Sequence, residues 1–236
     1  MTIKMHKNPI VVRLFQCFFG VIMLASCVSP ESKESSKTSN KEVLAFAEGD
    51  SLKMEEGLTI LHEGPRGGGY KTSRGDVKRY TVYRVQLSND FPKDLELNLN
   101  LPNQGVKLQP GSSIDLDVFL IPKNFTPNHV KDTFNFGVKM EDFFESGSAP
   151  LLMLSQTIPA REKQAIYIAV VLKNDPPNGM TRTKLFLEGG GSEAPFYGVR
   201  SESKYPLDDM GTNLYFGISI DPPNNYAVIP CGRISF

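Results

Sequence analysis

Few side chains in this sequence belong to the types that do catalytic or metal-binding chemistry. The chain of 236 residues contains three cysteines and three histidines and has no tryptophan. His62 and His129 each lack a second His or Cys close by in the sequence, whereas a zinc site needs several ligands at compatible spacing. Cys231 has no flanking residues typical of a nucleophile. We therefore expect structural histidines and a small buried cysteine, and the sequence predicts no metal or other cofactor.

One pair of carboxylates could act together. Asp115 and Asp117 are separated by one residue in an alternating segment, and alternate side chains of a strand lie on the same face. Two carboxylates in this arrangement could bind Ca²⁺ or hydrolyse a glycosidic bond. A solvated strand face explains the same spacing without chemistry, and this is the interpretation that we favour.

Two glycine-rich segments lack the features of a phosphate-binding loop. Residues 64–69 do not end in Gly-Lys-Ser/Thr, and neither this segment nor residues 189–191 opens a helical pattern. We expect both segments to be flexible loops.

The first residues have the organisation of a secretory signal. Basic residues precede an apolar run over residues 14–24, and the small residues Ala25 and Ser26 follow it. A helix of this length covers only about 16 Å, roughly half of the ~30 Å hydrocarbon core of a bilayer. A cleavable signal therefore fits this segment better than a permanent membrane anchor.

The end of this signal resembles the lipobox of bacterial lipoproteins. In Leu24-Ala25-Ser26-Cys27, an aliphatic residue and two small residues precede a cysteine. The resemblance implies cleavage before Cys27, a diacylglycerol on its sulfur and acylation of its new amino group, and therefore a membrane-anchored protein. The residue after Cys27 is Val28 rather than Asp, which by the same resemblance favours the outer membrane, on its periplasmic or surface face. The resemblance covers the signal alone.

The expected domain organisation has three parts. Residues 1–26 form the signal peptide, residues 27–42 the lipidated cysteine with a flexible tether, and residues 43–236 a β-sandwich region. The tether alternates Ser with both signs of charge and is too polar to offset the entropy of ordering. A subdivision of the third part into residues 43–150 and 151–236 remains open.

Alternation of apolar and polar residues predicts an all-β fold. The alternating segments are residues 95–101, 114–120, 134–140 and 214–220. Residues 166–172 are apolar throughout, which is typical of a strand covered on both faces. With the other candidates, about ten to twelve strands are separated by turn signals, and this pattern predicts an antiparallel β-sandwich with Ig-like layers. Helix is expected only as a turn or two, at residues 139–145 or 160–164.

Charge and aromatic residues indicate the class of partner. The 26 basic and 26 acidic residues balance, and removal of the basic signal leaves the mature chain mildly acidic, so nucleic acid is not an expected partner.

Four aromatic residues lie beside Gly, Ser, Pro and acidic residues, where strand cores are not expected: Phe143, Phe144, Phe196 and Tyr197. These aromatic side chains could contact a partner protein, or they could close the open ends of the sandwich.

Together these observations predict a non-catalytic lipoprotein. It would bind or scaffold a protein partner within an envelope or surface assembly, while the acyl chains on Cys27 hold it in the membrane. Two alternatives remain open: a hydrolase of envelope glycans that uses an Asp/Glu pair, and a carrier of a small apolar ligand.

Overall fold

The computed structural model describes residues 56–103, 105–108, 114–129, 133–173, 179–190, 200–220 and 225–236. The chain divides into two units, Met1–Gly49 and Asp50–Phe236, and all of the described residues belong to the second. Cys27 and the tether therefore lie outside the described residues. Among the described residues, no helix has the length and apolar character needed to cross a membrane.

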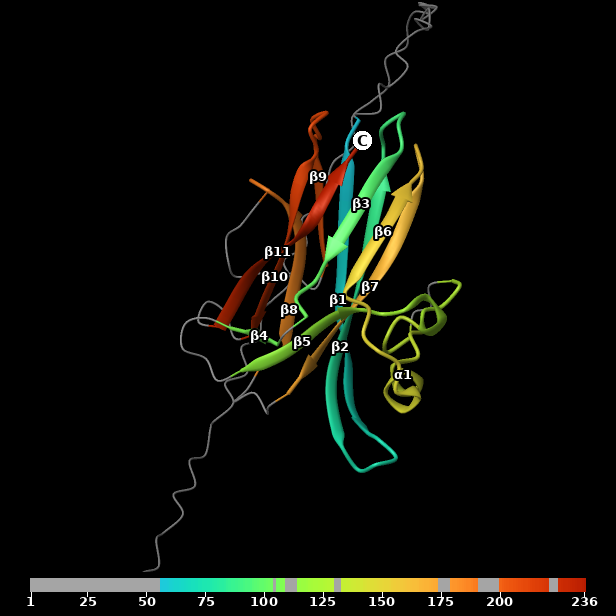
Figure 1. Ribbon diagram of the computed structural model, residues 1–236, viewed down its shortest axis with the longest axis vertical. Coiled ribbons are helices and arrows are strands. Elements are labelled where there is room, and N and C mark those ends of the chain that lie inside the picture. Colours follow the sequence, from blue (N-terminus) through green and yellow to red (C-terminus); the bar gives the residue numbers. More distant parts are fainter. Residues whose placement is uncertain are drawn as a thin grey trace, which may run out of the picture. The chain divides into compact units, whose positions relative to one another are not determined.

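The described strands form two antiparallel sheets that pack face to face (Figure 1), which confirms the predicted β-sandwich. One sheet has the order β4 (Val106–Lys107), β5 (Asp115–Leu120), β7 (Lys163–Leu172), β2 (Val77–Asn89), β1 (Leu58–Lys71) and β9 (Arg200–Tyr205). The other has the order β6 (Met153–Ile158), β3 (Leu95–Asn100), β11 (Asn225–Ser235), β10 (Thr212–Ile220) and β8 (Thr181–Leu187). We call them the six-stranded and the five-stranded sheet.

Each sheet takes strands from both halves of the region. In the six-stranded sheet, β7 pairs with β5 and β2, and in the five-stranded sheet, β3 pairs with β11 and β6. These pairings cross residue 150 in both layers. The two halves therefore form one sandwich, and the topology gives no support to a subdivision at that position.

The main core lies between the two sheets. Leu95, Leu97 and Leu99 of β3 are buried there, while Glu96 and Asn98 between them are exposed, as the alternation predicts. Along this strand, the five-stranded sheet thus has one buried face and one solvent-exposed face. The buried residues that share this core come from both sheets and include Tyr83, Phe186 and Phe216.

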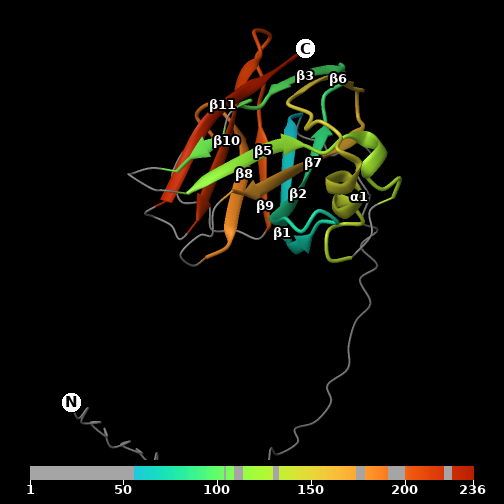
Figure 2. The same ribbon diagram turned by 60° about the horizontal axis from the view of Figure 1, so that its bottom comes forward.

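A second core covers the outer face of the six-stranded sheet. Along β7, Ile166, Ile168 and Val170 face the main core, whereas Tyr167 and the other alternate residues belong to the second core. The cover consists of the 3₁₀ turn η1 (Lys123–Phe125) and the helix α1 (Met140–Ser146), which lie beside this face in Figures 1 and 2. This confirms both the strand covered on two faces and the short helix near residues 139–145. The other candidate for a helix, residues 160–164, is a turn that leads into β7.

Two predictions about local structure are wrong. Residues 134–140 alternate as in a strand, but they form turns that lead into α1, because Phe136 and Gly137 both have positive φ and turn the chain back. Residues 64–69 were expected to be a loop, but β1 continues through them with a bulge between Glu63 and Arg66. A Cβ at Gly67, where φ is +151°, would lie 2.4 Å from the carbonyl oxygen of Tyr80, so glycine permits the close pairing with β2.

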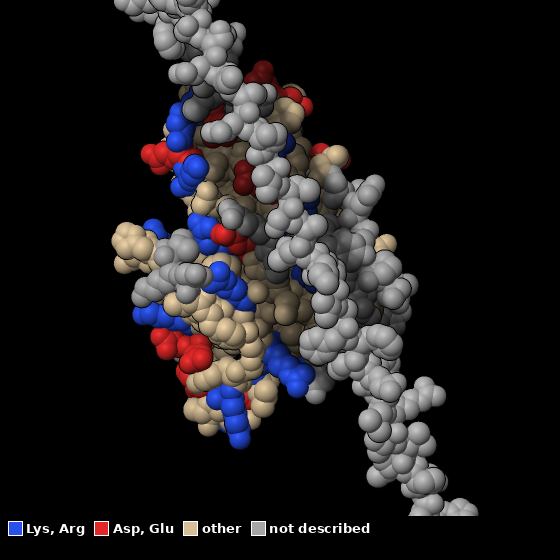
Figure 3. Space-filling model, turned by 180° about the vertical axis from the view of Figure 1, so that it is seen from behind, with Lys and Arg blue, Asp and Glu red and all other residues tan. Residues whose placement is uncertain are grey.

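Figure 3 shows the charged side chains on the face seen from behind. Lys and Arg side chains are interspersed with Asp and Glu over most of this face, and basic residues gather at the lower end, where β1 and β2 form a hairpin. The charges on this face thus do not form one continuous basic surface.

Candidate functional site

The sandwich is open along the side where β6 and β7 separate. A tight turn joins the two strands, in which the backbone N–H of Glu162 donates to the carbonyl of Pro159 (3.1 Å). From this turn β6 runs into the five-stranded sheet beside β3, and β7 runs into the six-stranded sheet beside β2. Among the described residues the two strands do not pair with each other, since β6 is the edge of the five-stranded sheet and β7 lies between β5 and β2 in the six-stranded sheet.

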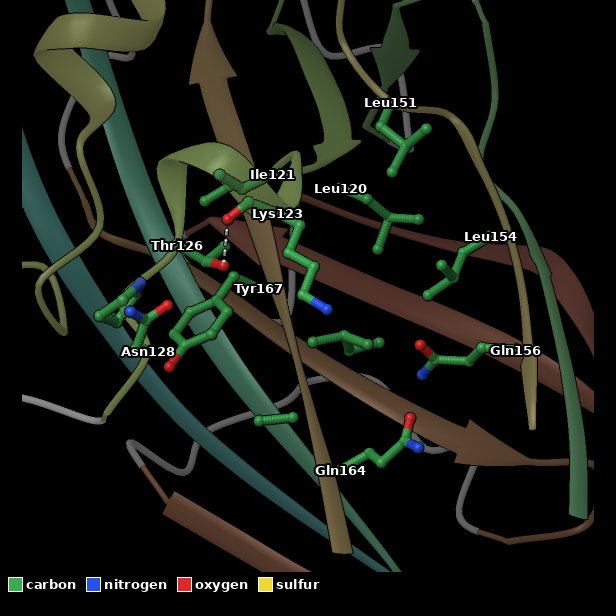
Figure 4. Close-up of a pocket in the computed structure, with 13 residues that line it drawn as sticks. Leu120, Ile121, Lys123, Thr126, Asn128, Leu151, Leu154, Gln156, Gln164 and Tyr167 are labelled. Atoms are coloured by element: carbon green, nitrogen blue, oxygen red, sulfur yellow. Dashed lines mark hydrogen bonds between the residues drawn. The ribbon is translucent and has the colours of Figure 1, made fainter. Parts of the chain in front are cut away.

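A cleft of about 600 Å³ occupies this open side (Figure 4). Its lining comes from the end of β5, from η1 and the residues after it, from β6 and from the first half of β7. The residues are Leu120, Ile121, Lys123, Thr126, Pro127, Asn128, Leu151, Leu154, Gln156, Gln164, Ala165, Ile166 and Tyr167. The volume lies within the range of ligand and peptide pockets in other proteins.

Hydrogen bonds close the cleft at its two ends. Near the turn, Gln164 Nε2 on β7 donates to the carbonyl of Thr157 on β6 (2.8 Å). At the other end, the backbone N–H of Leu120 donates to the carbonyl of Leu151 (2.8 Å) and that of Ile121 donates to Tyr167 (2.9 Å). Between these contacts the two strand edges stay apart, so that the cleft has a defined length.

The lining combines apolar side chains with amide groups. In Figure 4, Gln156 on β6 and Gln164 on β7 point toward the space between the strands, and the Lys123 side chain extends over it. Gln156 Nε2 is buried and has no hydrogen-bond partner. A buried donor without an acceptor costs free energy, so this group would gain from an acceptor supplied by a bound molecule. Among the described residues of the lining, Lys123 alone carries a charge.

The aspartates predicted to lie on one face do so, and one lysine forms ion pairs with both of them. Lys173 Nζ lies 2.9 Å from Asp117 Oδ1 and 3.9 Å from Asp115 Oδ1. The hydrogen bond to Asp117 raises the pKa of Lys173, so the ammonium stays charged between the two carboxylates. Neither aspartate lines the cleft. The two aspartates and Lys173 thus form an ion-pair cluster on a strand face.

The aromatic residues proposed as partner contacts have a different role where the structure describes them. Phe143 is 4% exposed and packs against Phe119 and Phe125 in the second core, which corrects its assignment as a partner contact. Phe144 is half-buried and its ring contacts Tyr70 and Tyr80 of the β1–β2 hairpin. Both rings therefore fix α1 to the sheet.

Two of the predicted aromatic contacts, Phe196 and Tyr197, lie outside the described residues, as does the predicted lipidation site Cys27. The two histidines and Cys231 are described. His62 is buried in the sandwich and His129 is exposed.

The thiol of Cys231, the one cysteine among the described residues, is unreactive. Cys231 on β11 is buried in the main core, and burial raises the pKa of its thiol to about 12. The thiolate, which is the nucleophilic form, is therefore negligible at neutral pH. Among the described residues, no three His, Cys, Asp or Glu side chains come together in a way that could hold a metal ion.

Sequence reasoning did not find the cleft. One signal in the sequence could have pointed to it, because residues 151–158 contain no charged side chain. Comparison of the chain with protein-family models, with curated proteins and with solved structures gave no match.

Proposed function

We propose that this protein is a membrane-anchored bacterial lipoprotein that acts as a non-catalytic binding or scaffolding component of an envelope or surface assembly. The anchor is proposed from the lipobox-like residues 24–27. The observation that carries the binding role is the cleft between β6 and the first half of β7, which lies beside the edge strand β6 and combines apolar with amide side chains. This chemistry suits a segment of polypeptide, which offers both apolar side chains and backbone acceptors.

The proposed mechanism is geometric. Acyl chains on Cys27 would hold the protein in the outer membrane, since each buried CH₂ contributes about 0.8 kcal/mol. Residues 28–42 would then act as a flexible spacer with a root-mean-square reach of about 20 Å and an extended limit near 50 Å. The sandwich supplies a rigid frame for the cleft, and the spacer keeps a bound protein partner within its reach of the membrane.

A second candidate is the carriage of a small apolar ligand. The cleft volume of about 600 Å³ favours it, because pockets for such ligands have volumes of roughly 300 to 1,000 Å³. Native mass spectrometry of the purified protein separates the two candidates. A carrier retains a small molecule of defined mass, whereas a binding component shows the mass of the chain with its acyl groups.

The anchor has a direct test. Changing Cys27 to Ser should move the protein from the membrane fraction to the soluble fraction and abolish its labelling by a clickable fatty acid, because the sulfur that accepts the diacylglycerol is gone. The matched control Ser26→Ala keeps a small residue before the cysteine and should leave both properties unchanged. Labelling of the Cys27→Ser protein at the normal level would contradict the proposal.

The binding role is tested by photo-crosslinking in cells. A photo-reactive phenylalanine analogue placed at Asn128, an exposed residue of the cleft lining, should form a crosslink with one envelope protein. The same analogue at Met210, which is 77% exposed and does not line the cleft, should not form this crosslink. Identical crosslinks from both positions, or none from Asn128, would speak against the cleft as the binding site.

A further inference from the structure

Building on the proposed function, we propose that the outer edge of β6 accepts an extended segment of a partner protein as an additional strand of the five-stranded sheet. In this mode of recognition, backbone hydrogen bonds hold the added strand and its alternate side chains enter a neighbouring pocket. Here the pocket is the cleft between β6 and β7.

Among the described residues, no strand pairs with the side of β6 that faces away from β3. On the side toward β3, β6 pairs with β3 and places Leu154 opposite Leu99. The N–H of Leu101 donates to the carbonyl of Leu152 on this side (2.8 Å). Because hydrogen-bonded positions alternate along an antiparallel pair, the backbone groups of Leu154 also face β3, and those of Met153 and Ser155 face outward.

Two hydrogen bonds agree with this alternation. The carbonyl of Leu151 accepts a hydrogen bond from Leu120, and that of Thr157 accepts one from the side chain of Gln164, both on the outer side of β6. Met153 and Ser155 lie between these two residues. The N–H and C=O groups of Met153 and Ser155 are therefore the ones that an added strand would use.

β6 also lacks the features that protect the other sheet edges. Edge strands usually carry charges or proline, or are very short, which prevents unwanted pairing. The edge strand β8 contains Arg182 and Lys184, β9 contains Glu202 and Lys204, and β4 is two residues long. The sequence of β6, Met-Leu-Ser-Gln-Thr-Ile, has no charge, proline or glycine. An edge of this kind is suited to pairing with another strand.

The cleft indicates which kind of strand fits. An added strand would direct every second side chain into the cleft, beside Leu154 and Ile166, where apolar residues are favoured. Gln156 Nε2 would find an acceptor on the incoming chain, and the ammonium of Lys123 favours a carboxylate at that end of the cleft. The partner segment is thus an extended peptide with alternating apolar residues and one acidic residue.

The test uses a fluorescein-labelled peptide in which Val and Thr alternate and the last residue is Glu, titrated against the full lipidated chain in detergent. We expect saturable binding and slower hydrogen exchange at the amides of Met153 and Ser155 once the peptide is bound. Absence of binding at up to about 1 mM peptide, or protection only elsewhere, would overturn the inference.

Two matched pairs isolate the backbone hydrogen bonds. Ser155→Pro removes one outward N–H and leaves the ladder with β3 intact, so we expect it to weaken binding at least about tenfold, whereas Ser155→Ala keeps the N–H and should bind as the wild type does. A peptide with N-methyl groups on the amides that face β6 should lose binding to the unchanged protein, which tests the same bonds should Ser155→Pro fold poorly. Equal affinity in both pairs would overturn the inference.

Self-association is the competing result. Light scattering after gel filtration should give a monomer, and a wild-type dimer that Ser155→Pro converts to a monomer would show that a second copy of the chain occupies the edge. A failure of these measurements is distinguishable from a failure of the proposed function. Crosslinking at Asn128 reports on partner binding in the cleft whether or not the partner adds a strand to β6.

Discussion

Lowering the pH from 7 to 4 is expected to remove about 3 kcal/mol from the free energy of unfolding through one side chain, His62. This residue of β1 is 3% exposed and lies inside the sandwich. Its Nε2 atom lies 2.7 Å from Thr183 Oγ1, and its Nδ1 atom has no hydrogen-bond partner. Burial, reinforced by the charge of Lys184, lowers the pKa of His62 from 6.5 to about 3.

The sign follows from proton binding in the two states. Below pH 6.5 the unfolded chain protonates this histidine, while the folded protein keeps it neutral until the pH approaches 3. Because the unfolded state binds more protons in this window, stability is full above pH 6.5 and falls steadily as the pH drops toward 3.

Urea unfolding at pH 7, 6, 5 and 4 measures this effect as a difference between variants. His62→Gln retains a group that can bond to Thr183 but does not titrate, so its stability should fall less with pH than that of the wild type. His129→Gln, at an exposed position, should follow the wild-type curve. Parallel curves for the wild type and His62→Gln would show that His62 is not the source of the acid sensitivity.

The layers of the sandwich could be predicted because burial leaves its pattern in the sequence. Apolar and polar side chains alternate along β3 because one face of its sheet is exposed to solvent. The run Ile166–Leu172 within β7 is apolar throughout because both faces of its sheet are covered there. The same argument fails for residues 134–140, where alternate apolar side chains reach the second core from turns and from the start of α1. Alternation indicates which side chains are buried, but it does not by itself determine whether the backbone forms a strand or a series of turns.

The cleft depends on pairings that the sequence does not display. Strands joined by a tight turn usually pair with each other, but β6 and β7 enter different sheets. The burial patterns of the two strands differ. β6 alternates between exposed and half-buried residues up to the buried Ile158 and suits a sheet with one solvent-exposed face, whereas β7 needs a sheet covered on both faces. Even so, the edge of β6 is open because no other described strand pairs there, and local composition does not predict which strands become neighbours.

The second core links the fold to the candidate site. η1 contributes Lys123 to the cleft and Phe125 to the second core, so the same three-residue turn forms one wall of each. The helix α1 packs on this turn through Phe143, whose ring lies edge-on to Phe125 with centroids 5.4 Å apart. The position of Lys123 over the cleft therefore depends on packing at the outer face of the six-stranded sheet.

Replacing Phe143 with Ala should lower the free energy of unfolding by about 3–5 kcal/mol, the cost of deleting a buried aromatic ring. Phe143 is 4% exposed and its ring also packs against Phe119 of β5, with centroids 5.3 Å apart. The helix α1 has only seven residues, which is too short to be stable without tertiary contacts. Loss of the ring should therefore also release α1 and η1 from the sheet, and their backbone amides should exchange faster with solvent.

Phe134→Ala is the matched control, because Phe134 belongs to the same covering segment but is 65% exposed. It should change the free energy of unfolding by less than about 0.5 kcal/mol. Urea unfolding measures both variants, and hydrogen exchange locates the change. We expect faster exchange over η1 and α1 in Phe143→Ala while the amides of β3 and β11, in the other sheet, stay protected. Equal losses of stability in the two variants would contradict the assignment of Phe143 as the residue that holds the outer cover in place.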